Sequence, residues 1–590
     1  MENNNAEEYI FNSPDYVHMV IEYSGKIPEE KDKSKEIFIN IINNEYAILS
    51  IKANVISNDN SLANYQNINL IKEIINKRFQ DVEGFKVMHV LPPQIYTLQE
   101  ISAIEASGIN NLKANPNLDL TGEGVIIGII DTGIDYLSEE FRDANGKTRI
   151  ISIWDQTIDN NENNNGIVSF GTVYNRNEID RAIGEYNLGR NPYGIVASKD
   201  ENGHGTGMAG IVGAIGKNNY IAGIAPKCEF VIVKLSEANY LKDRLKIDIP
   251  IYDLPFVFSA IEYLKKVLIN EKKPVVVLLL LGSNNGNHKG DNIFDSFIES
   301  VSSNVGMVIV TGAGNQGTQD GHVSGRIKNK ESIEVVEIII DEKQKFMLLE
   351  LWVDLPSILE INLVSPSGEE TGFVPAEPNI INVNKFIFEK TKTEIIYFLP
   401  EEYTGEEMIS VYFDDLAPGI WQLKLRIIHG ELAVFNAWLL QKGIAFPGTR
   451  FSPSDHYGTI TIPGDSDFVV TVAAYNQNNN NLLAYSGVSF RSEYTEKIDF
   501  TAGGVNTMTV GLNNSMQVIN GTSLAAAIGA GACVLLFQWG IVQKNYPYMY
   551  SQSIKTFLRR GVIKRQKENY PNPEWGYGII NFYKIFESML

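Results

Sequence analysis

Apolar residues occur in several unbroken runs along this 590-residue chain. Residues 126–130, 275–281 and 308–310 form short runs of this kind, which are typical of parallel strands buried on both faces. Residues 524–542 form a longer apolar stretch that is rich in Ala and Gly, which favours a helix. The pattern predicts an α/β fold around a parallel sheet.

The long apolar stretch is almost uncharged and about long enough to cross a bilayer. Its small residues and the polar Gln538 favour a helix in a protein core instead. We therefore expect no membrane span.

Two other regions have different patterns. In residues 1–99, strand-like runs at 16–23, 46–56 and 85–90 accompany one helix face made by Leu70, Ile71, Ile74 and Ile75, which predicts a small α+β unit. Residues 326–450 carry closely spaced strand-like runs without helical periods, which predicts an inserted all-β sandwich or jelly roll. These runs are 333–340, 346–353, 358–364, 384–388, 393–398, 408–413, 421–428 and 432–440.

Chain length and net charge limit the number of domains and the classes of partner that we expect. A chain of 590 residues is too long for one core, and about three domains are expected. The net charge of −21 argues against nucleic acid or an anionic membrane surface as a partner.

Cys228 and Cys533 lie in apolar segments and are expected to be buried free thiols, with no disulfide framework or metal cluster. The polar, acidic start of the chain lacks the features of a secretory signal, so we expect a cytoplasmic protein.

The clearest chemical signal is the segment 520–526, Asn-Gly-Thr-Ser-Leu-Ala-Ala. A small-residue turn there presents Ser523 at the start of the apolar helix, where helix N–H groups favour developing negative charge. The same segment also fits an ordinary helix cap, so a base and an acid elsewhere are needed to make Ser523 a nucleophile.

Both groups are present in suitable contexts. Asp131 ends the apolar run 126–130, and His204 lies among glycines just before another apolar helical run. The order Asp, His, Ser is the chain order of subtilisin. In this hypothesis Ser523 attacks a carbonyl carbon, His204 moves the proton, and Asp131 orients the imidazole. Asn315 follows a third buried strand and, with the Ser523 N–H, supplies an oxyanion hole.

These four motifs in this order resemble the subtilisin-like (S8) serine peptidases. The resemblance covers roughly residues 100–325 and 451–590 and implies a doubly wound parallel sheet. It places Asp131, His204, Ser523 and Asn315 on the family's catalytic positions, and it gives Asp135 a more structural role. It also implies a substrate strand and pocket at Leu281, Gly282 and Gly314. Two departures are Ala527, where the family usually has Pro, and Leu280, where many members have Ser.

The resemblance implies that residues 1–99 are a prodomain that assists folding and lies with its tail in the active-site cleft. Self-cleavage is then expected between Gln99 and Glu100. An uncut accessory domain is the alternative. The implied mechanism needs no cofactor. Acidic loops such as 159–165 show no recognisable calcium-ligand spacing, so no metal site is assigned.

The domain order, with 1–99, 100–325, 326–450 and 451–590 as successive segments, resembles that of the Csp germination proteases of anaerobic spore-forming bacteria. That resemblance implies a spore protein that activates the zymogen of a cortex-lytic hydrolase by limited proteolysis. Some relatives have lost triad residues and act as sensors or regulators. A non-catalytic regulator and a general subtilase with another substrate therefore stay open as alternatives.

Overall fold

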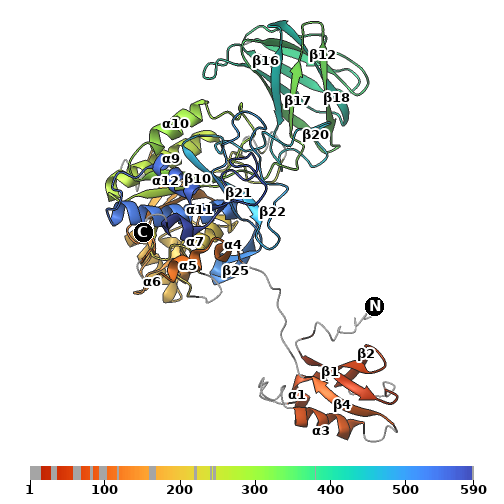
Figure 1. Ribbon diagram of the computed structural model, residues 1–590, viewed down its shortest axis with the longest axis vertical. Helices are drawn as coiled ribbons and strands as arrows, with labels where there is room; N and C mark the ends of the chain where they lie inside the picture. Colours follow the sequence, from red (N-terminus) through yellow and green to blue (C-terminus); the bar gives the residue numbers. More distant parts are fainter. Residues whose placement is uncertain are drawn as a thin grey trace. The chain divides into compact units, whose positions relative to one another are not determined.

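The computed structural model describes residues 13, 15–27, 36–56, 68–79, 84–91, 102–115, 118–158, 168–217, 222–239, 242, 247–378 and 380–587. The chain divides into two compact units, Met1–Glu100 and Ile101–Leu590. Figure 1 shows both units, and each is described by itself below.

The first unit contains a four-stranded antiparallel sheet in the order β2-β3-β1-β4, with α3 (Ile68–Arg78) packed on its apolar face. The predicted strand 46–56 is too long, because β3 ends at Lys52 and the short helix α1 (Ala53–Ile56) follows. Lys52 pairs with Tyr16, the first residue of β1, so no neighbouring strand continues the ladder beyond it. The strands are β1 (Tyr16–Ser24), β2 (Ile37–Ile41), β3 (Tyr46–Lys52) and β4 (Lys86–Leu91).

The second unit is built on an 11-stranded sheet in the order β26-β27-β23-β21-β10-β9-β5-β8-β6-β7, with β22 paired to β21. In this spatial order, every pair of neighbouring strands between β27 and β6 is parallel. The three remaining strands, β7, β22 and β26, each pair antiparallel with their neighbour. The strands are β5 (Ile126–Asp131), β6 (Ile150–Asp155), β7 (Thr172–Asn175), β8 (Glu229–Lys234), β9 (Val275–Leu279), β10 (Met307–Gly312), β21 (Val469–Asn476), β22 (Asn481–Leu482), β23 (Phe500–Gly503), β26 (Val562–Ile563) and β27 (Ile579–Ile580).

Helices cover both faces of this sheet, which explains the unbroken apolar runs of its central strands. In β5, Ile127 and Ile129 face a core that includes α7 and α11, whereas Ile126 and Ile130 face a core that includes α9 and α10. The α/β prediction is therefore confirmed. The helices are α4 (Ala103–Ala106), α5 (Ile109–Lys113), α6 (Arg176–Asn187), α7 (His204–Gly213), α9 (Leu254–Glu271), α10 (Ile293–Ser302), α11 (Thr522–Phe537), α12 (Ser551–Arg560) and α13 (Phe582–Glu587).

Helix α11 is the long apolar stretch noted in the sequence. It packs directly against α7 in the middle of the unit, and Ala and Gly at its surface allow close approach (Figure 1). Among the described residues, the segment Thr522–Val542 is the one helix long and apolar enough to span a membrane, but 83% of its most apolar window is buried inside the protein. It is a core helix.

Residues 322–451 form two antiparallel sheets that share one apolar core. We call this region the β sandwich. Seven of the eight strand predictions agree with a strand to within two residues at each end, whereas 384–388 is displaced: β15 ends at Lys385 and Phe386 turns into the core. The strands are β11 (His322–Ile327), β12 (Ile333–Ile340), β13 (Phe346–Val353), β14 (Ile358–Val364), β15 (Ile381–Lys385), β16 (Lys392–Phe398), β17 (Glu407–Asp414), β18 (Gly419–His429), β19 (Ala433–Leu439) and β20 (Arg450–Phe451).

The β sandwich is joined to the loop that follows β9. The ring of Trp438 stacks on His288 with ring centroids 4.3 Å apart, and on His322 at 4.6 Å. Lys289 forms ion pairs with Asp354, at 2.7 Å, and with Glu406. These contacts hold the β sandwich against the residues that leave the central sheet.

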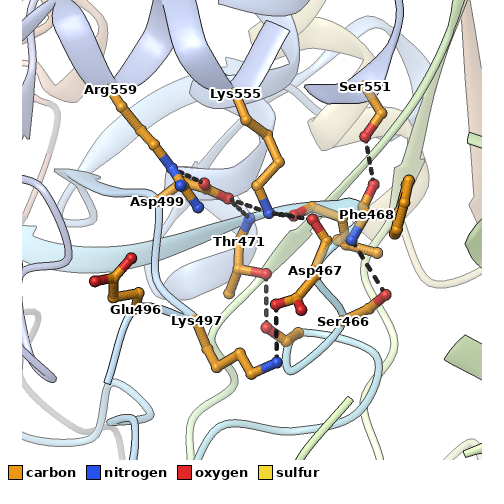
Figure 2. Close-up of polar contacts among 12 residues, drawn as sticks. Ser466, Asp467, Phe468, Thr471, Glu496, Lys497, Asp499, Ser551, Lys555 and Arg559 are labelled. Carbon is orange, nitrogen blue, oxygen red and sulfur yellow. Dashed lines mark hydrogen bonds and ion pairs between the residues drawn. The ribbon is translucent and has the colours of Figure 1, made fainter. Parts of the chain in front are cut away.

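A buried ionic cluster fixes α12 to the sheet (Figure 2). The Asp499 carboxylate is fully buried, and it accepts from Arg559 Nε at 2.7 Å and from the Thr471 N–H at 2.9 Å. Lys555 Nζ lies 3.2 Å from the same carboxylate and donates to the carbonyl oxygen of Val469 at 2.5 Å. The cluster pairs the buried Asp499 carboxylate with two cations and joins two distant parts of the sequence.

Both cysteines are buried, as the sequence indicated. Burial raises the pKa of the Cys228 thiol to about 12 and raises that of Cys533 further. Thiols of this kind are inert packing residues, because the thiolate is the reactive form.

Candidate active site

The predicted acid and base are hydrogen-bonded to each other. Asp131 is the last residue of β5 and is 3% exposed, and His204 is the first residue of α7. His204 Nδ1 lies 2.9 Å from Asp131 Oδ1 and 2.8 Å from Oδ2. Because Nδ1–H donates to the carboxylate, Nε2 carries the free lone pair and is the atom able to accept a proton.

The pKa of His204 reflects two opposing effects. Burial lowers the pKa of the imidazole, while the charge and the hydrogen bond of Asp131, together with the charge of Asp200, raise it. The net result is a pKa above the ordinary value for histidine. Asp131 therefore stabilises the imidazolium that forms when His204 accepts a proton.

Close packing explains the glycines around His204. A Cβ atom on Gly205 would overlap the carbonyl oxygen of Gly133, which follows Asp131 in the chain. The absence of a side chain at this position lets the start of α7 lie directly against the end of β5. The acid and the base therefore meet because their two flanking backbones can touch.

Asp200 organises this loop, and the sequence reasoning missed it. Its carboxylate accepts from the N–H groups of Asn202 and Gly203 at 3.1 and 2.8 Å, and from the Thr132 hydroxyl at 2.9 Å. It also accepts from both the N–H and the hydroxyl of Thr206, at 3.0 and 2.6 Å. The sequence holds no local signal that separates Asp200 from an ordinary loop cap, because Asn202 in the same loop also caps a main-chain N–H, that of His204 at 3.2 Å.

Asp135, the expected second acid of the Asp131 motif, connects three segments. Its N–H donates to the Thr206 hydroxyl at 2.8 Å, and its carboxylate accepts from the N–H groups of Leu137 at 3.2 Å and Asn513 at 2.7 Å. Burial raises its pKa. These contacts agree with a structural role.

Asn315 and the segment before Ser523 also meet. Asn315 Oδ1 accepts from the Thr522 hydroxyl at 3.2 Å and from the Thr522 N–H at 3.4 Å. This contact assigns the oxygen of the amide to Thr522 and leaves Nδ2 as a donor. Ser523 is half-buried in the first turn of α11. Among the described residues, no hydrogen bond joins Ser523 to His204, a contact that often forms only with substrate bound.

The predicted substrate residues follow two neighbouring strands. Leu281 and Gly282 come after β9, and Gly314 follows β10 with a φ of +87°. A Cβ on either Gly282 or Gly314 would collide with the side chain of Thr461. The two glycines and Thr461 thus form one packed group beside Asn315.

A cavity of about 730 Å³ lies beside the acid–histidine pair. Thr132, which follows Asp131, and Asn202, which precedes His204 by two residues, are on its lining together with Tyr252 and Lys234. Its lining includes neither Ser523 nor Asn315, so it is not the pocket predicted at Leu281, Gly282 and Gly314.

Gln99, Glu100 and the acidic segment 159–165 lie outside the described residues. Within the part of the chain that the structure describes, no group of three or more His, Cys, Asp or Glu side chains is arranged to hold a metal ion.

The site combines an oriented acid–histidine pair, a serine at a helix start and a nearby amide at one edge of a parallel sheet. This combination is that of a serine peptidase. The model of the subtilase family, Peptidase_S8, matches residues 122–343 and 454–578, more than half of the chain. The chain therefore belongs to the subtilase family of serine peptidases.

One solved structure agrees with this assignment. The chain is 30% identical to the CspB protease of Clostridium perfringens with a TM-score of 0.72, and the match covers 82% of this chain and 98% of that one. The structure is thus that of a Csp-type subtilisin-like peptidase. Sphericase (14% identity, TM-score 0.42, covering 80% and 97%) and a cold-adapted subtilisin-like proteinase (13%, 0.39, covering 82% and 98%) are also similar. The search of curated proteins found no match.

Proposed function

We propose that this protein is a processing endopeptidase whose nucleophile is Ser523, whose base is His204 and whose orienting acid is Asp131. The double hydrogen bond from His204 Nδ1 to the buried Asp131 carboxylate carries the proposal, because it fixes the tautomer that general-base catalysis needs.

In this mechanism Ser523 Oγ attacks the scissile carbonyl carbon while its proton passes to His204 Nε2. The negative charge that develops on the carbonyl oxygen is stabilised by Asn315 Nδ2 and the Ser523 N–H. The imidazolium then gives its proton to the leaving amine, and water hydrolyses the acyl-enzyme by the same steps. The orientation of the Asn315 amide towards Thr522 supports this role for Nδ2.

The proposed biological reaction is limited proteolysis of a cortex-lytic hydrolase zymogen in the spore during germination. Support comes from the similarity to the CspB protease over nearly that protein's whole length. In this proposal residues 1–99 act as an inhibitory prodomain, cut from the enzyme between Gln99 and Glu100, and residues 326–450 are an inserted jelly-roll domain.

A second candidate is a regulatory protein that does not cleave a substrate. It is compatible with the missing hydrogen bond between Ser523 and His204 among the described residues, which by itself does not separate a regulator from a peptidase without substrate. The general subtilase with another substrate is the third.

Incubation of the purified protein with a cortex-hydrolase zymogen tests the proposal, with Ser523→Ala as the control. Cleavage at one site by the wild type alone supports it. Absence of zymogen cleavage, with retained cleavage of an unrelated unfolded protein, favours the general subtilase. A wild type that cuts neither substrate and does not react with an organophosphorus serine reagent favours the regulator.

A further inference from the structure

A second cavity, of about 450 Å³, lies between the end of α6 and the tip of a β-hairpin. The hairpin consists of β24 (Thr507–Val510) and β25 (Met516–Ile519), which pair antiparallel. Most of the lining residues are exposed, so a ligand can enter from solvent. The lining residues that decide its chemistry are Asp135, Tyr186, Arg190, Tyr193, Asn513 and Asn514.

Asp135 gives this cavity a negative charge. Its two oxygens accept the main-chain N–H groups of Leu137 and Asn513, which leaves about two of its roughly four lone-pair sites for further donors. Among the described residues, no lysine, arginine or histidine forms an ion pair with it, and the buried Arg142 lowers its pKa less than either N–H group does. Burial raises that pKa, and a cation bound beside the carboxylate would offset the effect.

The other groups around the cavity also favour a cation. The guanidinium of Arg190 is already paired with Glu185, through contacts of 2.5 and 2.9 Å. Helix α6 ends beside the cavity, and the carbonyl groups of its last turn carry partial negative charge. The rings of Tyr186 and Tyr193 have electron-rich faces. The ammonium of Lys199 lies 3.9 Å from the centre of the Tyr193 ring, and because Lys199 is exposed, water screens its repulsion of a second cation.

The cavity is joined to the segments that carry the catalytic residues. The Asp135 N–H donates to the hydroxyl of Thr206, two residues after His204 on α7. The hairpin leads to Ser523, which follows the end of β25 by four residues. Asp135 is four residues from Asp131, a span of at most about 14 Å. An extended substrate covers such a span with about four residues.

The mechanism decides which part of a substrate comes near this cavity. His204 protonates the leaving amine, so the residues after the cleaved bond lie on the side of His204 and α7. We propose that the cavity is a subsite for the side chain of a lysine or arginine that follows the cleaved bond of a protein substrate by a few residues. Asp135 accepts from its charged group, and the Tyr186 ring packs against its stem. The inference rests on the proposed peptidase function and adds a substrate preference to it.

Cleavage of a randomised decapeptide library by the purified full chain tests this inference. Norleucine replaces methionine in the library, because it has the four-carbon stem of lysine without the ammonium group. The readout is the frequency of lysine plus arginine relative to norleucine at each position after the cleaved bond, found by sequencing the products. We expect an enrichment of about five- to tenfold at one position, from the carboxylate, the helix end and the ring together.

Asp135→Asn removes the charge, and the enrichment is expected to fall to about twofold or less. The ratio compares residues within one digest, so a lower overall rate caused by the lost N–H contact does not change it. Tyr186→Leu, at a ring that is 43% exposed, is expected to reduce the enrichment about two- to fourfold. Asp180→Asn is the matched control and should keep the wild-type enrichment, because Asp180 lies on α6 away from the cavity lining.

The outcomes separate the subsite from the peptidase function. No enrichment in the wild type, or the full wild-type enrichment in Asp135→Asn, overturns the inference and leaves the peptidase function intact. If Asp135→Asn does not fold, the full enrichment in Tyr186→Leu overturns it instead. A wild type that cleaves no member of the library counts against the endopeptidase function, and the inference falls with it.

Discussion

Asp200→Asn tests whether one buried carboxylate sets the loop that presents His204. Asp200 is 7% exposed and accepts five hydrogen bonds of 2.6–3.1 Å, three from main-chain N–H groups and two from hydroxyls. The asparagine side chain has the same shape but only one oxygen. Its NH₂ group then replaces the oxygen that faces the N–H and hydroxyl of Thr206.

The expected losses of stability and activity follow from that exchange. At least one hydrogen bond to a charged group is lost, and a hydrogen bond of this kind contributes about 1.5–3 kcal/mol. We therefore expect the free energy of unfolding to fall by about 2–3 kcal/mol. Displacement of His204 by a fraction of an ångström is expected to lower kcat/KM about 10- to 100-fold.

The variant also has a pH signature. The charge of Asp200 raises the pKa of His204, and only neutral His204 can act as a base, so kcat/KM increases as the pH rises through that pKa. Removing the charge lowers the pKa, and the acidic limb of the kcat/KM profile moves to lower pH.

The assay is kcat/KM for a peptide from about pH 5 to about pH 9, the range in which histidine titrates, with urea unfolding in parallel. Asp180→Asn is the control, since Asp180 on α6 also accepts a main-chain N–H, from Thr148 at 2.9 Å. An unmoved acidic limb and a plateau within twofold of wild type would refute the reasoning.

Three further variants test the catalytic acid, the oxyanion hole and the buried ionic cluster. Asp131→Asn is expected to lower kcat about 10⁴-fold, because His204 is then held in the wrong tautomer; a loss below tenfold in steady-state kinetics contradicts the assigned pair. Asn315→Ala is expected to lower kcat about 10²- to 10³-fold with little change in KM. A rise in KM of the same size, with kcat unchanged, would indicate that Asn315 only binds the substrate. Asp499→Asn leaves Arg559 and the buried Lys555 without their carboxylate, so urea unfolding is expected to show a loss of about 3 kcal/mol, and a loss below about 1 kcal/mol contradicts the role of the cluster in Figure 2.

The central sheet was predictable because burial on both faces leaves a direct signal. Strands β5, β9 and β10 are unbroken apolar runs, and each is followed by residues that the sequence reasoning assigned to the site. Because parallel strands end at one edge of the sheet, the proximity of such residues follows from local patterns. His204 follows none of these strands, so its hydrogen bonds to Asp131 do not come from that argument and depend on the packing of Gly205 against Gly133.

Other features depend on contacts between distant segments and left no local signal. Asp200 resembles an ordinary loop cap in the sequence, and its role emerges only when Thr132, 68 residues earlier, donates to it. The strand at 46–56 was overextended because its apolar pattern continues into α1, where the partner strand has already ended.

The central claim is that Ser523 is a nucleophile activated by His204 and Asp131. The most direct measurement is peptide mass spectrometry of the full chain after treatment with a fluorophosphonate, alongside the His204→Ala variant. The account predicts a covalent adduct on Ser523 in the wild type and a loss of at least about 10³-fold in labelling rate in the variant. An adduct on another serine, or equal labelling of Ser523 in both proteins, would contradict it.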